Sequence, residues 1–96
     1  MVDTTPRMSE FTNGNKRWKL CGELHRTDGP AVEWVDGSKQ WYLNGYHHRI
    51  DGPATEWGDG GKSWYLRNIC YTFDEWLIAN AEISEEEKVM LKLKYG

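Results

Sequence analysis

The sequence predicts a mainly β protein with an α-helical cap, in which stacked β-hairpins form an antiparallel sheet followed by two short C-terminal helices. Three observations predict this fold. The chain repeats with a period of 23 residues, each full copy contains tight-turn signals, and the repeat ends at two successive helix-capping sequences. Repetition at a short fixed period is typical of architectures in which each unit buries its apolar surface against the next.

The period divides a single domain, residues 1–96, into successive parts. A truncated copy covers residues 8–22, two full copies cover 23–45 and 46–68, and a broken copy with the cap covers 69–96. The full copies read ELHRTDGPAVEWVDGSKQWYLNG and YHHRIDGPATEWGDGGKSWYLRN. Positions that every copy keeps are expected to build the scaffold, so function is easier to place where the copies differ.

Each full copy predicts two strands and two tight turns. In the first, segments 31–35 and 38–43 are rich in β-branched and aromatic residues. Asp36-Gly37 between them predicts a two-residue type I′ turn, because both central residues of such a turn need positive φ. Asn44-Gly45 predicts a second turn of this kind, which leads into the next copy. At Asp28-Gly29-Pro30 we expect a corner, where glycine relieves the backbone and proline fixes φ.

The predicted turn sets the register of the hairpin and the faces of the sheet. A two-residue loop at Asp36-Gly37 places Trp34 opposite Lys39. The same register places Val32 opposite Trp41. One face then carries two aromatic rows, which are Phe11, Trp34 and Trp57, and Trp18, Trp41 and Trp64. The rows are either the core of a thin sheet or an exposed platform on which sugar rings stack.

The C-terminal tail departs from the repeat and predicts two short helices. Thr72 with Glu75, and Ser84 with Glu87, have the spacing of capping boxes, whose side chains satisfy free backbone N–H groups. Glutamates near the start of the second helix and lysines near its end suit the helix macrodipole. We expect the helices to close the open end of the sheet, and a docking role for the acidic helix pair is compatible with this.

Composition limits the class of protein. The chain has 96 residues, a net charge of −3 and six tryptophans, so a few large aromatic side chains must supply much of its buried surface. The basic residues form no stripe of the kind that binds nucleic acid, and no apolar run is long enough to span a membrane. The start, MVDTTPRMSEF, has no apolar signal sequence, so we expect a cytoplasmic protein.

The two cysteines, Cys21 and Cys70, lie two periods apart. In the expected sheet this separation is roughly 19 Å, whereas a disulfide needs Cα atoms within about 7 Å. We therefore expect two free thiols, and their spacing matches no metal motif.

The repeated His-Arg-x-Asp motif, at 25–28 and 48–51, contains side chains that acid–base catalysts use. An enzyme rarely needs two copies of one site in a chain this short. We expect these residues to bridge adjacent copies, by bonding turn carbonyls or through the pairs Arg26–Glu33 and Arg49–Glu56. With no nucleophile elbow, phosphate-binding loop or paired-histidine helix, the sequence predicts a protein that is not an enzyme and holds no cofactor or metal.

The motifs HRTDGPA, HRIDGPA and WYLNG resemble the HRxDGPA/WYxNG repeats of small bacteriophage proteins. They are also similar, more loosely, to MORN-type repeats, which share the 23-residue length and aromatic hairpins. The resemblance covers residues 8 to about 71. It implies a MORN-like stack that serves as an interaction surface, and the phage likeness implies an inhibitor of a bacterial antiviral defence protein (anti-CRISPR or similar) in the host cytoplasm. The alternatives are a carbohydrate-binding or virion-associated module and an antitoxin-like binding protein.

Contacts with such a host protein are predicted where the repeat fails and in the tail. The predicted partner-binding residues are Tyr46, His47, Arg67, Asn68, Tyr71, Trp76, Glu85 and Glu86. We expect neither a membrane nor a nucleic-acid partner. The sheet edge near Phe11 is expected to be free, which leaves open a homodimer through that edge.

Overall fold

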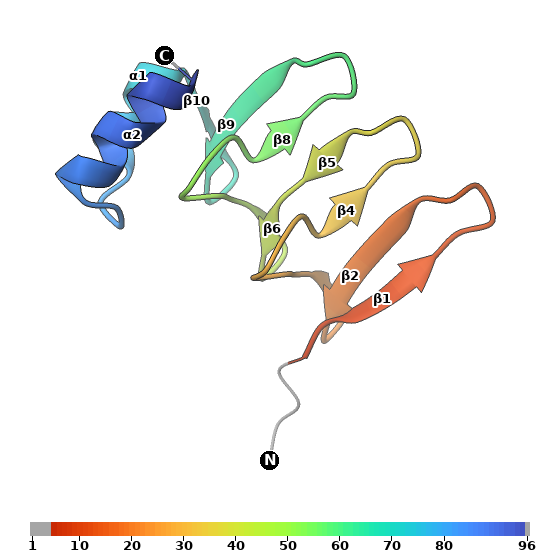
Figure 1. Cartoon of the computed structure of the whole chain (residues 1–96). Coiled ribbons are helices and arrows are strands. Elements are labelled where there is room, and N and C mark those ends of the chain that lie inside the picture. The colour runs from red at the N-terminus through yellow and green to blue at the C-terminus, as the bar shows by residue number, and fades with distance from the viewer. Residues whose placement is uncertain (1–4, 96) are drawn as a thin grey trace.

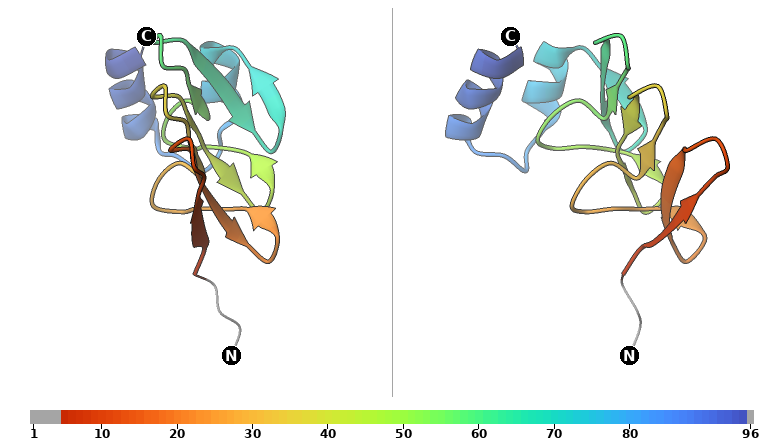
Figure 2. Two further views of the ribbon diagram at one scale, coloured as in Figure 1. Left: turned by 90° about the vertical axis from the view of Figure 1, so that its right-hand side faces the viewer. Right: turned by 45° about the vertical axis from the view of Figure 1, so that its right-hand side comes forward.

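The computed structural model describes residues 5–95, which form a fan of β-hairpins with two helices at one end (Figure 1). The molecule is thin, with extents of 38 × 37 × 20 Å. The two further views in Figure 2 show the helices beside the last hairpins and far from the first. The predicted order, a mainly antiparallel sheet followed by two C-terminal helices, is confirmed.

Two kinds of hairpin alternate along the chain. Hairpins of the first kind end in three-residue loops, here called tips, and their strands are β1 (Arg7–Glu10) with β2 (Lys16–Leu20), β4 (Val32–Glu33) with β5 (Lys39–Gln40), and β8 (Thr55–Glu56) with β9 (Lys62–Leu66). Hairpins of the second kind end in two-residue turns, and they pair β3 (Glu23–Leu24) with β2, β6 (Tyr42–Leu43) with β7 (Tyr46–His47), and β10 (Ile69–Tyr71) with β9. The main sheet runs β1-β2-β4-β5-β8-β9-β10.

The two-residue turns have the geometry predicted for Asn44-Gly45. Both residues have positive φ, at 51° and 81°, and the strands pair directly on either side of them. The equivalent turns have the same geometry, with φ of 52° and 81° at Cys21-Gly22 and 49° and 69° at Arg67-Asn68. Arginine has no intrinsic preference for positive φ, so the surrounding hairpin holds Arg67 in this conformation.

The tips differ from the prediction. Trp34 N–H donates to the carbonyl of Ser38 at 2.8 Å and Gly37 N–H donates to the carbonyl of Trp34 at 3.0 Å, so the loop has three residues. Gly37 has a positive φ of 93°, but Asp36 does not have the positive φ that a type I′ turn needs. The Asp36 carboxylate instead accepts a hydrogen bond from Ser38 N–H at 2.8 Å. The predicted type I′ turn at Asp36-Gly37 is wrong, because aspartate serves here as a side-chain acceptor inside the turn.

The extra loop residue shifts the register by one and reverses the face of one strand. The observed pairs are Val32–Gln40 and Glu33–Lys39, so both predicted pairs, Trp34–Lys39 and Val32–Trp41, are wrong. Side chains alternate along a strand, so Trp41 shares the face of Lys39 and Trp34 lies on the other. The two aromatic rows therefore occupy opposite faces of the sheet.

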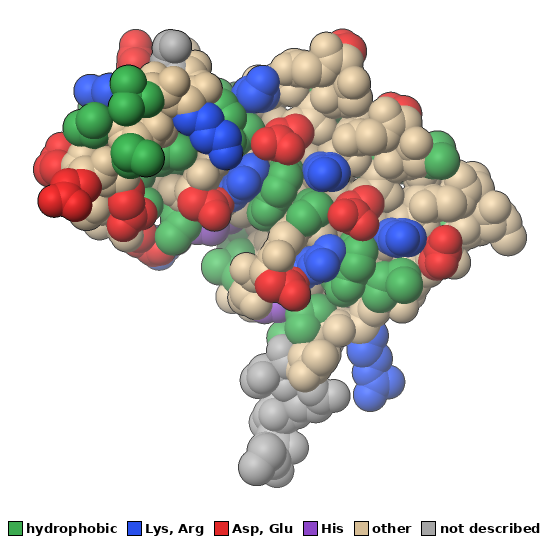
Figure 3. Space-filling view, viewed as in Figure 1, with side chains coloured by type: hydrophobic (Ala, Val, Ile, Leu, Met, Phe, Trp, Pro, Cys, Tyr) green, Lys and Arg blue, Asp and Glu red, His purple; other side chains and the backbone are tan. Residues whose placement is uncertain are grey.

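The face that carries Trp41 also carries a row of alternating charges, and we call it the charged face. Strand pairing aligns, in order, Glu10, Lys16, Glu33, Lys39, Glu56 and Lys62. Opposite charges that face each other across strands contribute modestly to sheet stability. Figure 3 shows this alternation running across the hairpins.

The aromatic rows separate into a covered set and an exposed set. On the charged face Trp64 is buried, and Trp18 and Trp41 are half-buried. The exposed row on the opposite face consists of Phe11, Trp34 and Trp57, which are 44%, 36% and 49% exposed. The interpretation of the aromatic rows as core therefore holds for Trp64 and is wrong for the exposed row of Phe11, Trp34 and Trp57.

The helices α1 (Phe73–Ala79) and α2 (Glu85–Tyr95) build the core around Trp64. Phe73, Trp76 and Tyr95 surround its ring, with centroid distances of 4.6, 4.7 and 5.2 Å. Asn80, at the end of α1, donates from Nδ2 to the carbonyl of Ile50 at 2.8 Å. The cap therefore binds both the last tryptophan of the row and the corner that precedes it.

The first predicted capping box is confirmed. Thr72 Oγ1 accepts from Glu75 N–H at 3.2 Å, and Glu75 Oε1 accepts from Thr72 N–H at 3.0 Å. At the second motif Ser84 Oγ accepts from Glu87 N–H at 3.1 Å, but the Glu87 carboxylate accepts from the Ser84 hydroxyl and not from its backbone. Half of the second box is therefore formed.

Cys21 and Cys70 are free and exposed, as the sequence predicts. Neither of the two described helices has the length and apolar character needed to cross a bilayer. The strand β1 ends the described sheet order, and the homodimer through that edge stays a prediction.

Candidate interaction groove

The arginine of each His-Arg-x-Asp motif fastens one copy of the repeat to the preceding one. Arg49 Cζ lies 3.8 Å from the ring centroid of Trp41. Its Nε donates to Asp51 at 2.8 Å, and its Nη1 donates to the carbonyl of Pro53 at 3.0 Å. Nη1 also lies 3.4 Å from Glu56, so the pair expected at this position is present. The face of the guanidinium therefore stacks on the Trp41 ring, and its edge donates hydrogen bonds to Asp51 and Pro53.

Arg26 repeats this geometry with one exception. Its Cζ lies 3.9 Å from the centroid of Trp18, and it donates to Asp28 at 2.8 Å and to the carbonyl of Pro30 at 3.2 Å. Within the described residues Asp28 is its ion-pair partner, and the predicted Arg26–Glu33 pair is not formed. The Arg26 guanidinium holds the pKa of Asp28 below its ordinary value.

The glycine of each corner makes room for the arginine. A Cβ on Gly52 would lie 2.7 Å from Cζ of Arg49, and a Cβ on Gly29 would lie 3.2 Å from Cζ of Arg26. Neither glycine has positive φ. The expected relief of the backbone is therefore not the reason for glycine at these corners; the close approach of the guanidinium is.

The motif histidines accept backbone amides. Asn44 N–H donates to Nδ1 of His25 at 2.9 Å, and Arg67 N–H donates to Nδ1 of His48 at 3.0 Å. Bridging of adjacent copies is thus confirmed for the arginines. Each histidine bridges copies through its backbone N–H, which donates to the carbonyl of Trp18 or Trp41 in the preceding copy, while its side chain binds a turn amide of its own copy. Burial lowers the pKa of His48, an effect that Glu82 partly offsets, and this favours the neutral form that the bond requires.

His47 lies in an aromatic stack between two strands. Its ring centroid is 4.9 Å from Tyr42 and 4.0 Å from Tyr65. Nε2 lies 2.9 Å from the carbonyl of Ala54 and 2.7 Å from the hydroxyl of Thr55. A carbonyl only accepts, so Nε2 carries the hydrogen. Burial lowers the pKa of His47, and the bond to Ala54 offsets part of the effect.

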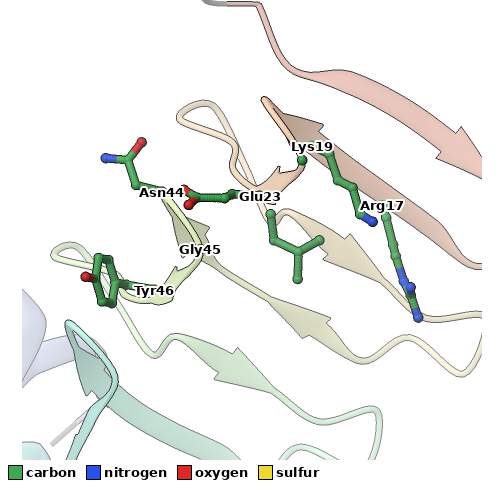
Figure 4. Close-up of a pocket in the computed structure, with 8 residues that line it drawn as sticks. Arg17, Lys19, Glu23, Asn44, Gly45 and Tyr46 are labelled. Atoms are coloured by element: carbon green, nitrogen blue, oxygen red, sulfur yellow. The ribbon is translucent and has the colours of Figure 1, made fainter.

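Three hollows follow one another along the row of two-residue turns. The first, about 480 Å³, includes Arg17, Lys19, Glu23 and Tyr46 (Figure 4). The second, about 450 Å³, shares Asn44 and Tyr46 with the first. The third, about 360 Å³, shares His48, Arg67 and Glu82 with the second. We call the combined depression the turn groove.

The turn groove gathers three of the predicted contact residues. Tyr46 is 53% exposed and borders the first two hollows. Arg67 borders the second and third, and Tyr71 lines the third. Asn68 secures the last turn, because its Oδ1 accepts from His47 N–H at 2.6 Å and its own N–H donates to the carbonyl of His47 at 2.9 Å.

The other predicted contact residues lie elsewhere. Trp76 is 0% exposed and its Nε1 donates to the carbonyl of Arg49 at 3.1 Å, so it stabilises the cap and offers no surface to a partner. Tyr71 also packs against the core, which makes its truncation a destabilising change. Glu85 and Glu86 are exposed on α2 and do not line the groove.

Sequence reasoning missed four charged residues of the groove, Arg17, Lys19, Glu23 and Glu82. Arg17 and Lys19 occupy repeat positions that later copies fill with Gln40 and Tyr42, so the same test of broken repetition finds them in the truncated copy. Glu82 lies in the segment between the helices, where no repeat position corresponds to it. In Figure 4 the two basic side chains extend from β2, and Glu23 lies between Lys19 and the following turn.

The charges of the groove are mixed, with two basic residues at one end and Arg67 near Glu82 at the other. Residues 5–95 contain no group of three or more potential ligands that could hold a metal ion. Comparison with models of protein families, with curated proteins and with solved structures gave no match.

Proposed function

We propose that this chain is a non-enzymatic protein-binding module whose partner docks in the turn groove. The observation that carries the proposal is the position of Tyr46 and Arg67, two departures from the repeat that border the same hollow. Tyrosine and arginine are enriched among the residues that dominate binding energy at protein interfaces. Glu82 adds an acidic group beside them, so the surface suits a partner of mixed charge.

The proposal that the chain is not an enzyme rests on how its chemically active side chains are used. His25 and His48 each accept a backbone amide at Nδ1, and the neighbouring arginines stack on tryptophan rings. A catalytic base must reach the proton that it removes. The histidine side chains bound in this way fix the turns of their own copies, and the arginines hold adjacent copies together.

For the partner, we propose a bacterial antiviral defence protein that a phage-encoded inhibitor of the anti-CRISPR kind would block in the host cytoplasm. This step depends on the likeness of HRTDGPA, HRIDGPA and WYLNG to repeats of small phage proteins. A MORN-like stack agrees with alternating hairpins that add two strands per period to one sheet. Such stacks present long edges that suit protein recognition.

The groove is tested with variants that restore the repeat. Tyr46→Glu and Arg67→Asn introduce the residues that the preceding copy has at Glu23 and Asn44, and asparagine tolerates the positive φ of this turn. The wild-type chain captures a protein from a bacterial lysate, and biolayer interferometry then measures the affinity of each variant for that protein. We expect either change to weaken binding by more than about tenfold, as for a residue worth at least about 1.4 kcal/mol.

The control restores the repeat outside the groove. Ser63→Gln introduces the residue found at Gln40, on the strand β9 and away from the turns. It is expected to keep wild-type affinity, and circular dichroism checks that every variant is folded. Unchanged affinity in both groove variants would refute docking in the groove. Capture of a toxin would instead favour the antitoxin-like alternative.

A carbohydrate-binding or virion-associated module is the second candidate, and the exposed aromatic row favours it. Phe11, Trp34 and Trp57 are separated by two strand spacings each, or roughly 10 Å, on one face. Exposed rings at regular intervals suit stacking against a chain of sugars. If Trp57→Ala abolishes binding to a glycan array while Tyr46→Glu does not, this function replaces the first.

A further inference from the structure

The helix α2 contacts the core through Leu91 and Tyr95 and leaves three apolar side chains exposed. Leu91 is its buried residue, at 9% exposure, whereas Val89, Met90 and Leu93 are 57%, 67% and 78% exposed. At about 100° per residue these three side chains fall within an arc of roughly 100° on the side opposite Leu91, and the exposed Glu86 lies in the same arc at its N-terminal end. A contiguous apolar stripe on a small protein marks a surface that another molecule covers.

Charges flank this stripe in a regular pattern. Glu85 and Lys92 are seven residues apart, so they lie on one flank, and Glu87 and Lys94 lie seven apart on the other. On each flank the acidic residue is in the first turn and the basic residue is in the last. Figure 3 shows apolar side chains over α2 with acidic side chains grouped at one end of the helix.

We propose that α2 packs antiparallel against α2 of a second copy of this chain, about a two-fold axis near Val89 and Met90. The two-fold axis sets Glu85 opposite Lys92 of the second copy, and it sets Glu87 opposite Lys94 of the second copy. Both flanks then carry complementary charges, Val89 and Met90 of the two copies cover each other, and Glu86 lies beside Leu93 of the second copy at each end of the contact. The proposal is independent of the proposed function, because Val89, Met90 and Leu93 do not line the turn groove.

The charge pattern selects this occupant. A parallel pair would bring the acidic turns of both helices together, and like charges at that distance destabilise association. An antiparallel partner with the same sequence satisfies both flanks without any further residue. The helix has 11 residues, so the interface is small and the dimer is expected to form in a concentration-dependent manner.

The test exchanges the charges between two forms of the full chain. One form carries Glu85→Lys with Glu87→Lys, and the other carries Lys92→Glu with Lys94→Glu. Sedimentation equilibrium of the wild-type chain should give a mass that rises with concentration from 11.2 kDa toward twice that value. Each form alone should stay monomeric because like charges then face each other, whereas an equimolar mixture should regain the dimer.

The apolar stripe has its own variant and a matched control. Leu93→Ser should abolish the rise in mass, whereas Val35→Ser, at an equally exposed apolar position on a hairpin tip (71% exposed), should leave it unchanged. Circular dichroism confirms the helix content of each variant. A wild-type chain that stays monomeric at every concentration overturns the proposal. So does a dimer that survives Leu93→Ser and both charge forms, which would place the contact elsewhere, for example at β1.

Discussion

Replacing Arg49 with alanine removes the side chain that joins the corner at residues 49–53 to the ring of Trp41. The Arg49 side chain is 15% exposed, and its guanidinium stacks on the ring at 3.8 Å and donates to the carbonyl of Pro53 at 3.0 Å. Alanine fills none of this space and leaves the carbonyl without its donor. We expect a folded but markedly less stable protein.

The magnitude follows from the contacts that Arg49 loses. Stacking of a cation on a partly desolvated ring contributes about 1 kcal/mol, and a hydrogen bond from a charged donor to the Pro53 carbonyl contributes about 1.5 kcal/mol. The pairs with Asp51 and Glu56 add roughly 0.5 kcal/mol, because both carboxylates are substantially exposed. The total is about 3 kcal/mol, which lowers the melting temperature of a domain of this size by roughly 12–24 °C.

Urea unfolding followed by tryptophan fluorescence measures this loss, with Arg49→Lys as the matched control. Lysine keeps the charge but lacks the planar group that stacks and donates along its edge. Arg49→Lys should therefore lose about half of the contribution of about 3 kcal/mol that Arg49 makes to the free energy of unfolding. Arg26→Ala should cost slightly less than Arg49→Ala, because Arg26 has no pair with Glu33. If Arg49→Ala unfolds within about 0.5 kcal/mol of wild type, the arginines do not fasten the copies together, and the scaffold role of the motif is refuted.

Three further predictions test the faces, the stack and the tips. Trp64→Ala should cost about 3–5 kcal/mol in urea unfolding, and Trp57→Ala on the exposed row less than about 1.5 kcal/mol; equal costs would contradict the assignment of faces. The lowered pKa of His47 means that the unfolded chain takes up its proton first, so stability should fall as the pH drops from about 6.5 toward the folded pKa. Thermal melts between about pH 7.5 and 5.5 should show a shallower decline in His47→Leu, and an unchanged slope would count against the stack. Gly58→Ala should cost about 1–3 kcal/mol because its Cβ would collide with the carbonyl of Asp36, whereas Val35→Ala at the equivalent exposed position should stay within about 0.5 kcal/mol; equal effects would refute the tip packing.

The hairpins and the cap could be predicted because local chemistry determines them. The turn at Asn44-Gly45 needs two residues that tolerate positive φ, and Thr72 with Glu75 forms a capping box within four residues. Neither feature requires a distant partner. The period places the same turn at Cys21-Gly22 and at Arg67-Asn68, although neither is an Asn-Gly pair.

The faces of the sheet could not be predicted by the same route, because one loop residue decides them. Asp36-Gly37 fits a two-residue turn and a three-residue loop equally well by composition. The backbone bond from Trp34 N–H to Ser38 and the bond from Ser38 N–H to the Asp36 carboxylate distinguish the second. An error of one residue moves Trp34 to the opposite face. The same error places Glu33 and Lys39 on opposite faces of the sheet. The row of alternating charges therefore follows only from the observed register, in which Glu33 pairs with Lys39.

The candidate site was predictable to the extent that function lies where the repeat fails. Tyr46 and Arg67 are such positions, and they border one hollow although 21 residues separate them in the chain. Trp76 is also absent from the repeat, but it is buried against the ring of Trp64, with the ring centroids 4.7 Å apart. Broken repetition alone does not separate a contact residue from the residue that ends the stack.

The contacts between hairpins explain why departures gather along the turns. At the tips, the Asn15 side chain accepts from Val35 N–H and the Ser38 side chain accepts from Gly58 N–H, both at 2.8 Å, so each tip is bonded to the next. At the third tip the equivalent residue is Gly61, which has no side chain and no following tip to bind. A change at a bonded tip or corner leaves a polar group without its partner, whereas an outward side chain such as Tyr46 can change at little cost to stability. The turn row is therefore the part of this sheet that is free to vary with a binding partner.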